Sequence, residues 1–269
     1  MATSQTARER EAVSAPAVEI RNCHELEEFR ACLELQKQVW GFTDAELVPL
    51  RMFVVAAKIG GQVIGAFEGK RLVGFALAVP GARAGHPYLH SHMLAVLESH
   101  RNSGLGRKIK LFQREDALQR GFELIEWTFD PLEIKNAYLN IERLAAIARR
   151  YNLNQYGITS SPLQGFLPTD RLVAEWWLRS KRVEMFLQTG QKPQFETVQR
   201  ISVPAQIYEW KAAEGTRARA AEVQARNREQ FLKAFRGGLA VLGYERDAEG
   251  NGSFLLGRWE EGWSYAEAQ

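Results

Sequence analysis

The stretch that decides the fold runs from Tyr88 to Phe122 and begins YLHSHMLAVLESHRNSGLGRK. Residues 88–97 are mostly apolar and predict a strand, and a short polar loop then leads to RNSGLG (101–106), which opens a basic amphipathic helix. A glycine-rich turn at a helix N-terminus favours anions, because free backbone N–H groups and the helix dipole act together there. Arg101, Arg107 and Lys108 add counter-charge. The expected ligand is therefore a phosphorylated cofactor.

Two common phosphate motifs do not fit this stretch. A P-loop requires GxxxxGK[ST], which the sequence lacks, and a dinucleotide-binding turn requires a third glycine or alanine where Ile109 stands. The order strand, R-x-x-G-x-G, helix, second strand (Leu124–Phe129) and asparagine-bearing helix instead resembles the pyrophosphate loop region of the GNAT acyltransferase superfamily. Within that superfamily the chain is most similar to an uncharacterised bacterial branch, through YLHSHMLAV, IEWTFDPL and LPTDRLVAEWW. The core resemblance covers residues 18–160, and the branch resemblance reaches residue 180.

The resemblance implies an α/β (α+β) fold: a mixed, mostly antiparallel sheet flanked by helices, with a C-terminal α/β extension. It also implies acetyl-coenzyme A or another acyl-coenzyme A as co-substrate, with no metal. The coenzyme A diphosphate would lie on Arg101, Asn102, Ser103, Gly104, Leu105, Gly106 and Arg107. Backbone groups of Leu94, Ala95 and Val96 would hold the pantetheine arm and the acyl oxygen. Asn136 would contact the pantetheine arm, and Asn140, one helical turn later, is its close rival.

Two side chains are candidates for proton chemistry. In the family a general base often lies early on the strand before the loop, at the position of His90, although glutamate is usual there. Alternation along the strand places His90, His92, Leu94 and Val96 on one face. An imidazole titrates near neutral pH and could take a proton from an ammonium acceptor, directly or through water. Asp130, at the end of the next strand, either caps the following helix or contacts the acceptor amine.

The sequence departs from the family pattern at the general acid. Family members often carry a tyrosine about two helical turns after the helix asparagine, as the acid for the leaving thiolate. Arg143 and Ile147 stand near that place, whereas Tyr138 and Tyr151 are out of register. The general acid is therefore left open. A coenzyme A thiol is acidic enough to leave unaided, so the departure does not remove an enzymatic function.

Bulk composition narrows the classes of function. The chain has 269 residues, 45% hydrophobic and 25% charged, as expected for a globular protein. A net charge of +3 is too small to indicate nucleic acid binding. No apolar run approaches the roughly 20 residues of a membrane span, and the N-terminus lacks a secretory pattern, so a cytoplasmic location is expected. Cys23 and Cys32 are the only cysteines, which gives neither a disulfide framework nor a cysteine metal site.

The chain divides into three predicted parts: a flexible tail (1–16), a GNAT core that binds acyl-coenzyme A (17–160) and an extension packed on the core (161–269). Periodicity and turn signals predict the secondary structure. Predicted strands are 18–21, 61–67, 71–79, 88–97, 124–129, 172–178, 198–203, 239–244 and 253–259. Predicted helices are 25–40, 104–120, 134–150 and 212–235. One further helix is predicted after 25–40; Asp44 caps it, and it ends near Lys58.

The expected function is transfer of an acyl group, in the first instance acetyl, from acyl-coenzyme A to a primary amine of a small molecule. One alternative is an amino acid N-succinyltransferase that uses succinyl-coenzyme A. The alternative of another class is a catalytically silent acyl-coenzyme A-binding or interaction protein. A homodimer is left open by the sequence.

Overall fold

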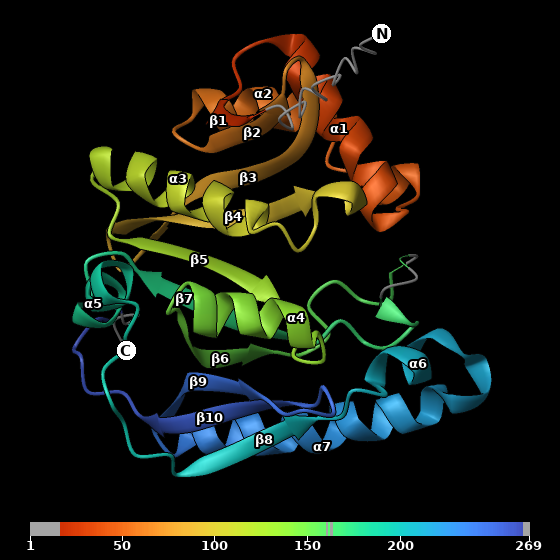
Figure 1. Cartoon of the computed structure of the whole chain (residues 1–269), viewed down its shortest axis with the longest axis vertical. Coiled ribbons are helices and arrows are strands. Elements are labelled where there is room, and N and C mark those ends of the chain that lie inside the picture. The colour runs from red at the N-terminus through yellow and green to blue at the C-terminus, as the bar shows by residue number, and fades with distance from the viewer. Residues whose placement is uncertain (1–16, 160, 162–163, 266–269) are drawn as a thin grey trace, which may run out of the picture.

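The computed structural model of the chain describes residues 17–159, 161 and 164–265. Within these residues ten strands form one sheet in the order β1-β2-β3-β4-β5-β7-β6-β9-β10-β8 (Figure 1). The strands are β1 (Val18–Asn22), β2 (Gln62–Glu68), β3 (Arg71–Arg83), β4 (His86–Val96), β5 (Leu124–Phe129), β6 (Ile147–Asn152), β7 (Arg171–Trp177), β8 (Gln199–Val203), β9 (Leu239–Arg246) and β10 (Gly252–Arg258). The predicted tail, residues 1–16, lies outside the described residues.

The helices flank this sheet. They are α1 (Leu26–Trp40), α2 (Leu50–Lys58), α3 (Leu105–Gln119), α4 (Ile134–Ala137), α5 (Lys181–Thr189), α6 (Ile207–Ala212) and α7 (Arg217–Arg236). The predicted mixed, mostly antiparallel sheet flanked by helices is confirmed, since the β4–β5 pair is parallel and the other described strand pairs are antiparallel.

Two helix layers cover opposite faces of the first four strands. Phe53 of α2 packs with Phe75 of β3, whereas Ile109 of α3 packs with Ala76, the next residue along the same strand. Successive strand residues point to opposite faces, so α1 and α2 lie on one side of the sheet and α3 on the other. Helices α3, α4 and α7 contribute to one shared apolar cluster over the remaining strands. None of the helices in the described residues is both long and apolar enough to cross a membrane.

The chain beyond residue 160 enters the middle of the sheet. β7 pairs with β5 on one side, through Trp176 and Ile125, and with β6 on the other, through Ala174 and Ala148. Trp176 is fully buried. β7, which lies beyond residue 160, is therefore located between β5 and β6, whose residues belong to the predicted core (Figure 1).

The predicted helix 134–150 is wrong in its second half. α4 continues as one stretch of π-helix, η3 (Tyr138–Arg143), and the chain then turns at Ala145, which has a φ of 58°. Residues 147–152 form β6 instead. Residues 144–148 are all buried, and a short apolar run fits a buried strand as well as a buried helix. In the sheet this segment lies between β7 and β9 and pairs with both, so it is a strand and not a helix.

Three smaller corrections concern the helices. Asp44 opens a single 3-10 turn, and α2 begins only at Leu50, because Pro49 disfavours helical conformation in the residue before it. The predicted helix 212–235 begins later, at Arg217, as α7; Ala212 ends the separate helix α6, and a turn that contains Gly215 lies between the two. α5 was not predicted; Ser180 caps it and Gly190 ends it.

Candidate active site

The predicted anion loop lies where the sequence placed it, at the start of α3. Gly104 has a φ of 82°, a left-handed conformation that favours glycine, and α3 begins at Leu105. The N–H groups of the first helical turn have no acceptor within the helix and are available to an anion. The loop residues 101–104 are exposed, as is Lys108. The start of α3 is therefore open to a diphosphate.

Two arginines are already partly engaged beside this loop. The Nε atom of Arg101 donates to the carbonyl oxygen of Val96 at 3.2 Å. The Nε atom of Arg107 donates to the carbonyl oxygen of Arg143 at 2.9 Å, which ties α3 to the end of η3. Burial, with a contribution from the charge of Arg143, lowers the pKa of Arg107. These contacts hold both guanidinium groups beside the helix N-terminus.

A pocket opens where β4 and β5 separate. The two strands pair at Leu89–Ile125 and His90–Glu126, and beyond these pairs they diverge. The opening has a volume of about 480 Å³. Its lining comprises Trp40, Phe42, Glu46, Val48, Ser91, His92, Met93, Leu94, Lys110, Trp127, Thr128, Phe129, Asp130, Glu133, Asn136, Leu139, Asn140, Tyr156, Thr159, Ser161, Gln164 and Arg171. Backbone groups of β4 that face this opening need partners, since buried N–H and C=O groups are rarely left unpaired.

A bulge in β4 changes which side chains share a face. The register against β3 passes from Ala78–Ser91 to Leu77–Met93, so His92 is an extra residue. Ser91 then points to α3, as Leu94 does, because Ser91 bonds to side chains of α3 and Leu94 packs against Leu105. The expectation that His90 shares a face with Leu94 is therefore wrong. His92 lines the pocket, and His90 does not.

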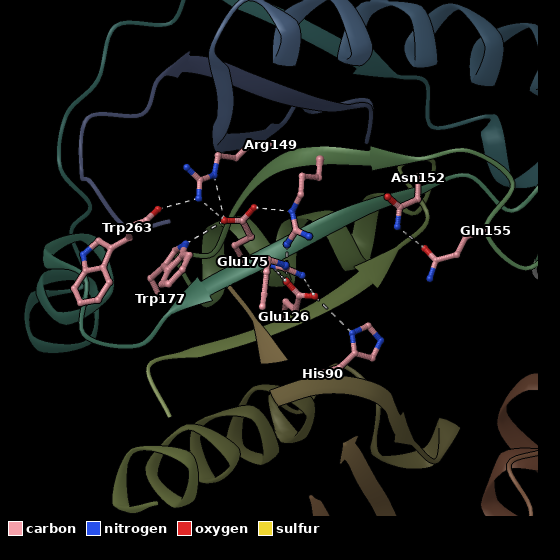
Figure 2. A network of polar contacts seen from close by, with 10 residues as sticks. His90, Glu126, Arg149, Asn152, Gln155, Glu175, Trp177 and Trp263 are labelled. Carbon is pink, nitrogen blue, oxygen red and sulfur yellow. Dashed lines mark hydrogen bonds and ion pairs between the residues drawn. The ribbon is translucent and has the colours of Figure 1, made fainter. Parts of the chain in front are cut away.

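His90 lies beside a network of buried charges, shown in Figure 2. Its Nδ1 atom is 4.0 Å from Glu126 Oε1. Glu126 accepts from Arg83 at 2.9 and 3.0 Å and also from Arg150, which bridges to Glu175 at 3.1 Å. Burial alone would raise the pKa of Glu126, but the two arginines hold it below its usual value. Glu126 is thus an ionised, fully paired carboxylate.

The imidazole of His90 is itself poised to stay neutral. Burial and the neighbouring His92 lower its pKa, although Glu126 acts in the opposite direction. Burial also lowers the pKa of His92. A neutral imidazole has one nitrogen free to accept a proton, so the protonation state suits a base near pH 7.

Asp130 and Glu133 form an acidic wall of the pocket. Asp130 Oδ1 accepts from the backbone N–H of Leu132 at 2.8 Å, just before α4. Its Oδ2 atom lies 3.0 Å from the Nζ atom of Lys211, which also lies 2.8 Å from Glu133. Burial raises the pKa of Glu133, partly offset by Lys211. Despite burial, the two carboxylates raise the pKa of Lys211.

The two asparagines of the α4 segment both reach the pocket. Asn136 is exposed on α4, and Asn140 is buried on η3. The tyrosines considered for the general acid lie elsewhere. Tyr138 is 37% exposed and does not line the pocket, and the hydroxyl of Tyr151 donates to Asp170 at 2.8 Å. Burial and Asp170 raise the pKa of Tyr151 strongly, which disfavours proton release.

Sequence reasoning missed Lys110, a pocket residue on α3 that is only 2% exposed. Its Nζ atom lies 3.0 Å from Ser91 Oγ and 2.6 Å from Gln113 Oε1. It also lies 3.8 Å from the centre of the Trp127 ring. A usable signal was present, because Lys110, Gln113 and the buried Ala117 recur at helical spacing on one face. In the described residues no group of three His, Cys, Asp or Glu side chains is placed to hold a metal.

Comparison with known proteins places this site in context. Residues 19–136 match the sequence model of the acetyltransferase (GNAT) family. An N-acetyltransferase from Staphylococcus aureus Mu50 superposes with a TM-score of 0.50 at 14% identity, over 61% of this chain and 99% of that one. An acetyltransferase of the GNAT family from Streptococcus pneumoniae gives a TM-score of 0.47 at 14% identity, over 59% and 98%. No match was found among curated proteins.

Proposed function

We propose that this chain, whose residues 19–136 match the acetyltransferase (GNAT) family, is an acyl-coenzyme A-dependent N-acyltransferase that transfers an acyl group, in the first instance acetyl, to a primary amine of a small molecule. The observation that carries the proposal is the combination of two features in one place. An exposed anion site at the start of α3 adjoins a pocket between two diverging strands. A phosphorylated, amide-bearing thioester needs both.

The acyl donor would lie across these two features. Its diphosphate would bind residues 101–107, where backbone N–H groups and arginines converge. The amide groups of its pantetheine arm would pair with the free edge of β4 at Leu94, Ala95 and Val96, as an added strand does. Asn136 would contact the same arm from the other wall, since its side chain lines the pocket.

The acceptor would enter from the acidic and aromatic side of the pocket. Asp130 and Glu133 attract an ammonium group, and Trp40 and Tyr156 offer aromatic faces near it. His90 remains our candidate base; because it lies outside the pocket lining, it would act through water. Asp130 would hold the acceptor ammonium in place. The thiolate would leave without a protein acid.

A panel assay tests the proposal directly. Purified protein is mixed with acetyl- or succinyl-coenzyme A and a set of amines and amino acids, and free thiol is followed over time. Amine-dependent thiol release supports an acyltransferase, and the faster donor decides between acetyl and succinyl transfer. Coenzyme A binding without release on any amine would favour the silent binding protein, and absence of binding would refute the proposal.

A further inference from the structure

Arg171, at the start of β7, lines the pocket and bonds to neutral groups of the protein. Its Nη1 atom donates to the carbonyl oxygen of Asp170 at 2.9 Å, and its Nη2 atom donates to Gln164 Oε1 at 3.2 Å. In the described part of the chain, no carboxylate lies within ion-pair distance of this guanidinium group. The pocket therefore contains a fixed positive charge whose counter-ion is not supplied by the described residues.

Gln164 holds the guanidinium group in place. Gln164 is only 5% exposed, and its Nε2 atom donates to the carbonyl oxygen of Pro168 at 3.3 Å, so its Oε1 atom stays turned toward Arg171. The Cζ atom of Arg171 lies 5.7 Å from the centre of the Tyr156 ring. Gln164 and Tyr156 also line the pocket. A guanidinium group has five N–H donors, and the two hydrogen bonds to the protein leave three of them for a ligand.

Lys110 is the other lysine or arginine of the described pocket lining, and protein groups occupy its amine. Its Nζ atom lies within hydrogen-bond distance of Ser91 Oγ and Gln113 Oε1, and it is 3.8 Å from the centre of the Trp127 ring. These contacts account for the three donors of an ammonium group. Of the two cationic side chains, Arg171 is therefore the one with donors available to a ligand.

The acidic wall complements Arg171. Asp130 and Glu133 share one cation, Lys211, so the wall carries one negative charge in excess when both carboxyl groups are ionised. Burial raises the pKa of Glu133, and the charge of Arg171 is among the effects that oppose this rise. The guanidinium group thus lies near enough to act on Glu133 without forming an ion pair with it. A ligand with an ammonium group and a carboxylate would meet an opposite charge for each.

We propose that Arg171 binds a carboxylate of the acceptor, and that the acceptor is an amino compound that carries a carboxylate, of which α-amino acids are the simplest class. This inference rests on the proposed function, because it names the acceptor of the same acyl transfer. The planar guanidinium group suits a carboxylate, since two parallel N–H···O bonds can form. A phosphate-bearing amine suits the pocket less well, because its second negative charge would face Asp130 and Glu133.

The test compares amines that differ by one carboxylate. The twenty standard amino acids are assayed with acetyl- and succinyl-coenzyme A, and free thiol is followed. The best amino acid is then compared with the amine left after its carboxylate is removed, and with phosphoethanolamine. The amino acid should exceed both in kcat/KM by at least about 100-fold, since a site built to bond a polar group rejects an analogue that lacks it.

Variants of Arg171 then assign this preference to the guanidinium group. Arg171→Met should bring the ratio of kcat/KM between the amino acid and its decarboxylated amine close to one, mainly through a higher KM for the amino acid. Arg171→Gln, which keeps a hydrogen-bonding side chain but no charge, should do the same. Arg171→Lys should keep part of the preference, because the charge remains and the planar fork is lost. Arg200→Met, which removes an exposed arginine from β8, is the matched control and should keep the wild-type ratio.

The outcomes that overturn the inference are separate from those that overturn the function. Wild-type protein that uses the decarboxylated amine or phosphoethanolamine as well as the amino acid would remove the inference and leave the acyltransferase intact. A wild-type ratio in folded Arg171→Met would do the same. Should Arg171→Met fail to fold, the wild-type ratio and Arg171→Gln decide. No thiol release with any amine would remove the proposed function and this inference together.

Discussion

Replacing Lys211 by methionine should destabilise the protein by about 3 kcal/mol at pH 7, because two pocket carboxylates lose their cation. The Lys211 side chain is 4% exposed and bridges Asp130 at 3.0 Å and Glu133 at 2.8 Å. Removing one partner from a buried ion pair typically costs about 3–5 kcal/mol. Because Glu133 is 24% exposed, solvent screens its share, and the lower end of that range applies.

The penalty should depend on pH in one direction. Burial raises the pKa of Glu133, and Lys211 opposes that rise. Without Lys211 the pKa of Glu133 moves further above its unfolded-state value. Between those two pKa values the folded state binds more protons than the unfolded state, so stability falls as pH rises through that window. The penalty is therefore full above the folded-state pKa and is relieved on acidification.

Denaturant unfolding at pH 7 and pH 5 measures both effects. Lys135→Met, which removes an exposed lysine from α4, is the matched control and should change the free energy of unfolding by less than about 0.5 kcal/mol. Adding Glu133→Gln to Lys211→Met should restore part of the loss. A penalty below about 1 kcal/mol, or one that does not shrink at pH 5, would refute the argument that Lys211 offsets part of the negative charge of the acidic wall.

Three further predictions address the donor, the base and the extension. Arg101→Ala with Gly104→Asp should weaken coenzyme A binding at least 100-fold, about 2.7 kcal/mol, by calorimetry; unchanged affinity in the folded double variant would end the assignment of the loop. His90→Ala should lower turnover by about 10²–10⁴-fold and remove the acid limb of the pH–rate profile, since protonated imidazole cannot act as a base; a persistent limb contradicts this. A 1–160 fragment should be insoluble or unfold without cooperativity, because it lacks β7; a cooperatively melting fragment would contradict one folding unit.

The features that could be predicted from sequence are local ones. The glycine-rich turn at Gly104, the start of α3 and the strand Leu124–Phe129 depend on neighbouring residues, and the structure agrees with all three. β6 could not be predicted, because its apolar residues fit either a helix or a strand until β7 and β9 are placed. The bulge at His92 could also not be predicted from the sequence, and because of it His90 does not share a face with Leu94.

The burial of Lys110 and Lys211 was not predicted, for a related reason. A lysine in a charged helix reads as exposed, and whether it is buried depends on what packs against it. Lys110 is buried because β4 and β5 diverge over α3 and leave its amine between them. Lys211 is buried because α6 meets the chain that follows β5. The spacing of Lys110 with Gln113 and Ala117 marks a helix face in the sequence, but the burial of both lysines is a consequence of the tertiary arrangement.

The division of the pocket between the two halves of the chain suggests how its specificity is set. The proposed donor surface, the loop at 101–107 with β4, comes entirely from residues before 160. The opposite wall carries Asp130 and Glu133, both of which pair with Lys211, and the later residue Arg171 lines it as well. Changes after residue 160 should therefore alter the acceptor more than the donor. Arg171→Met is the direct check, since it should change the Michaelis constant for the amine while leaving that for acyl-coenzyme A nearly constant; an equal change in both would show that the two walls act as one.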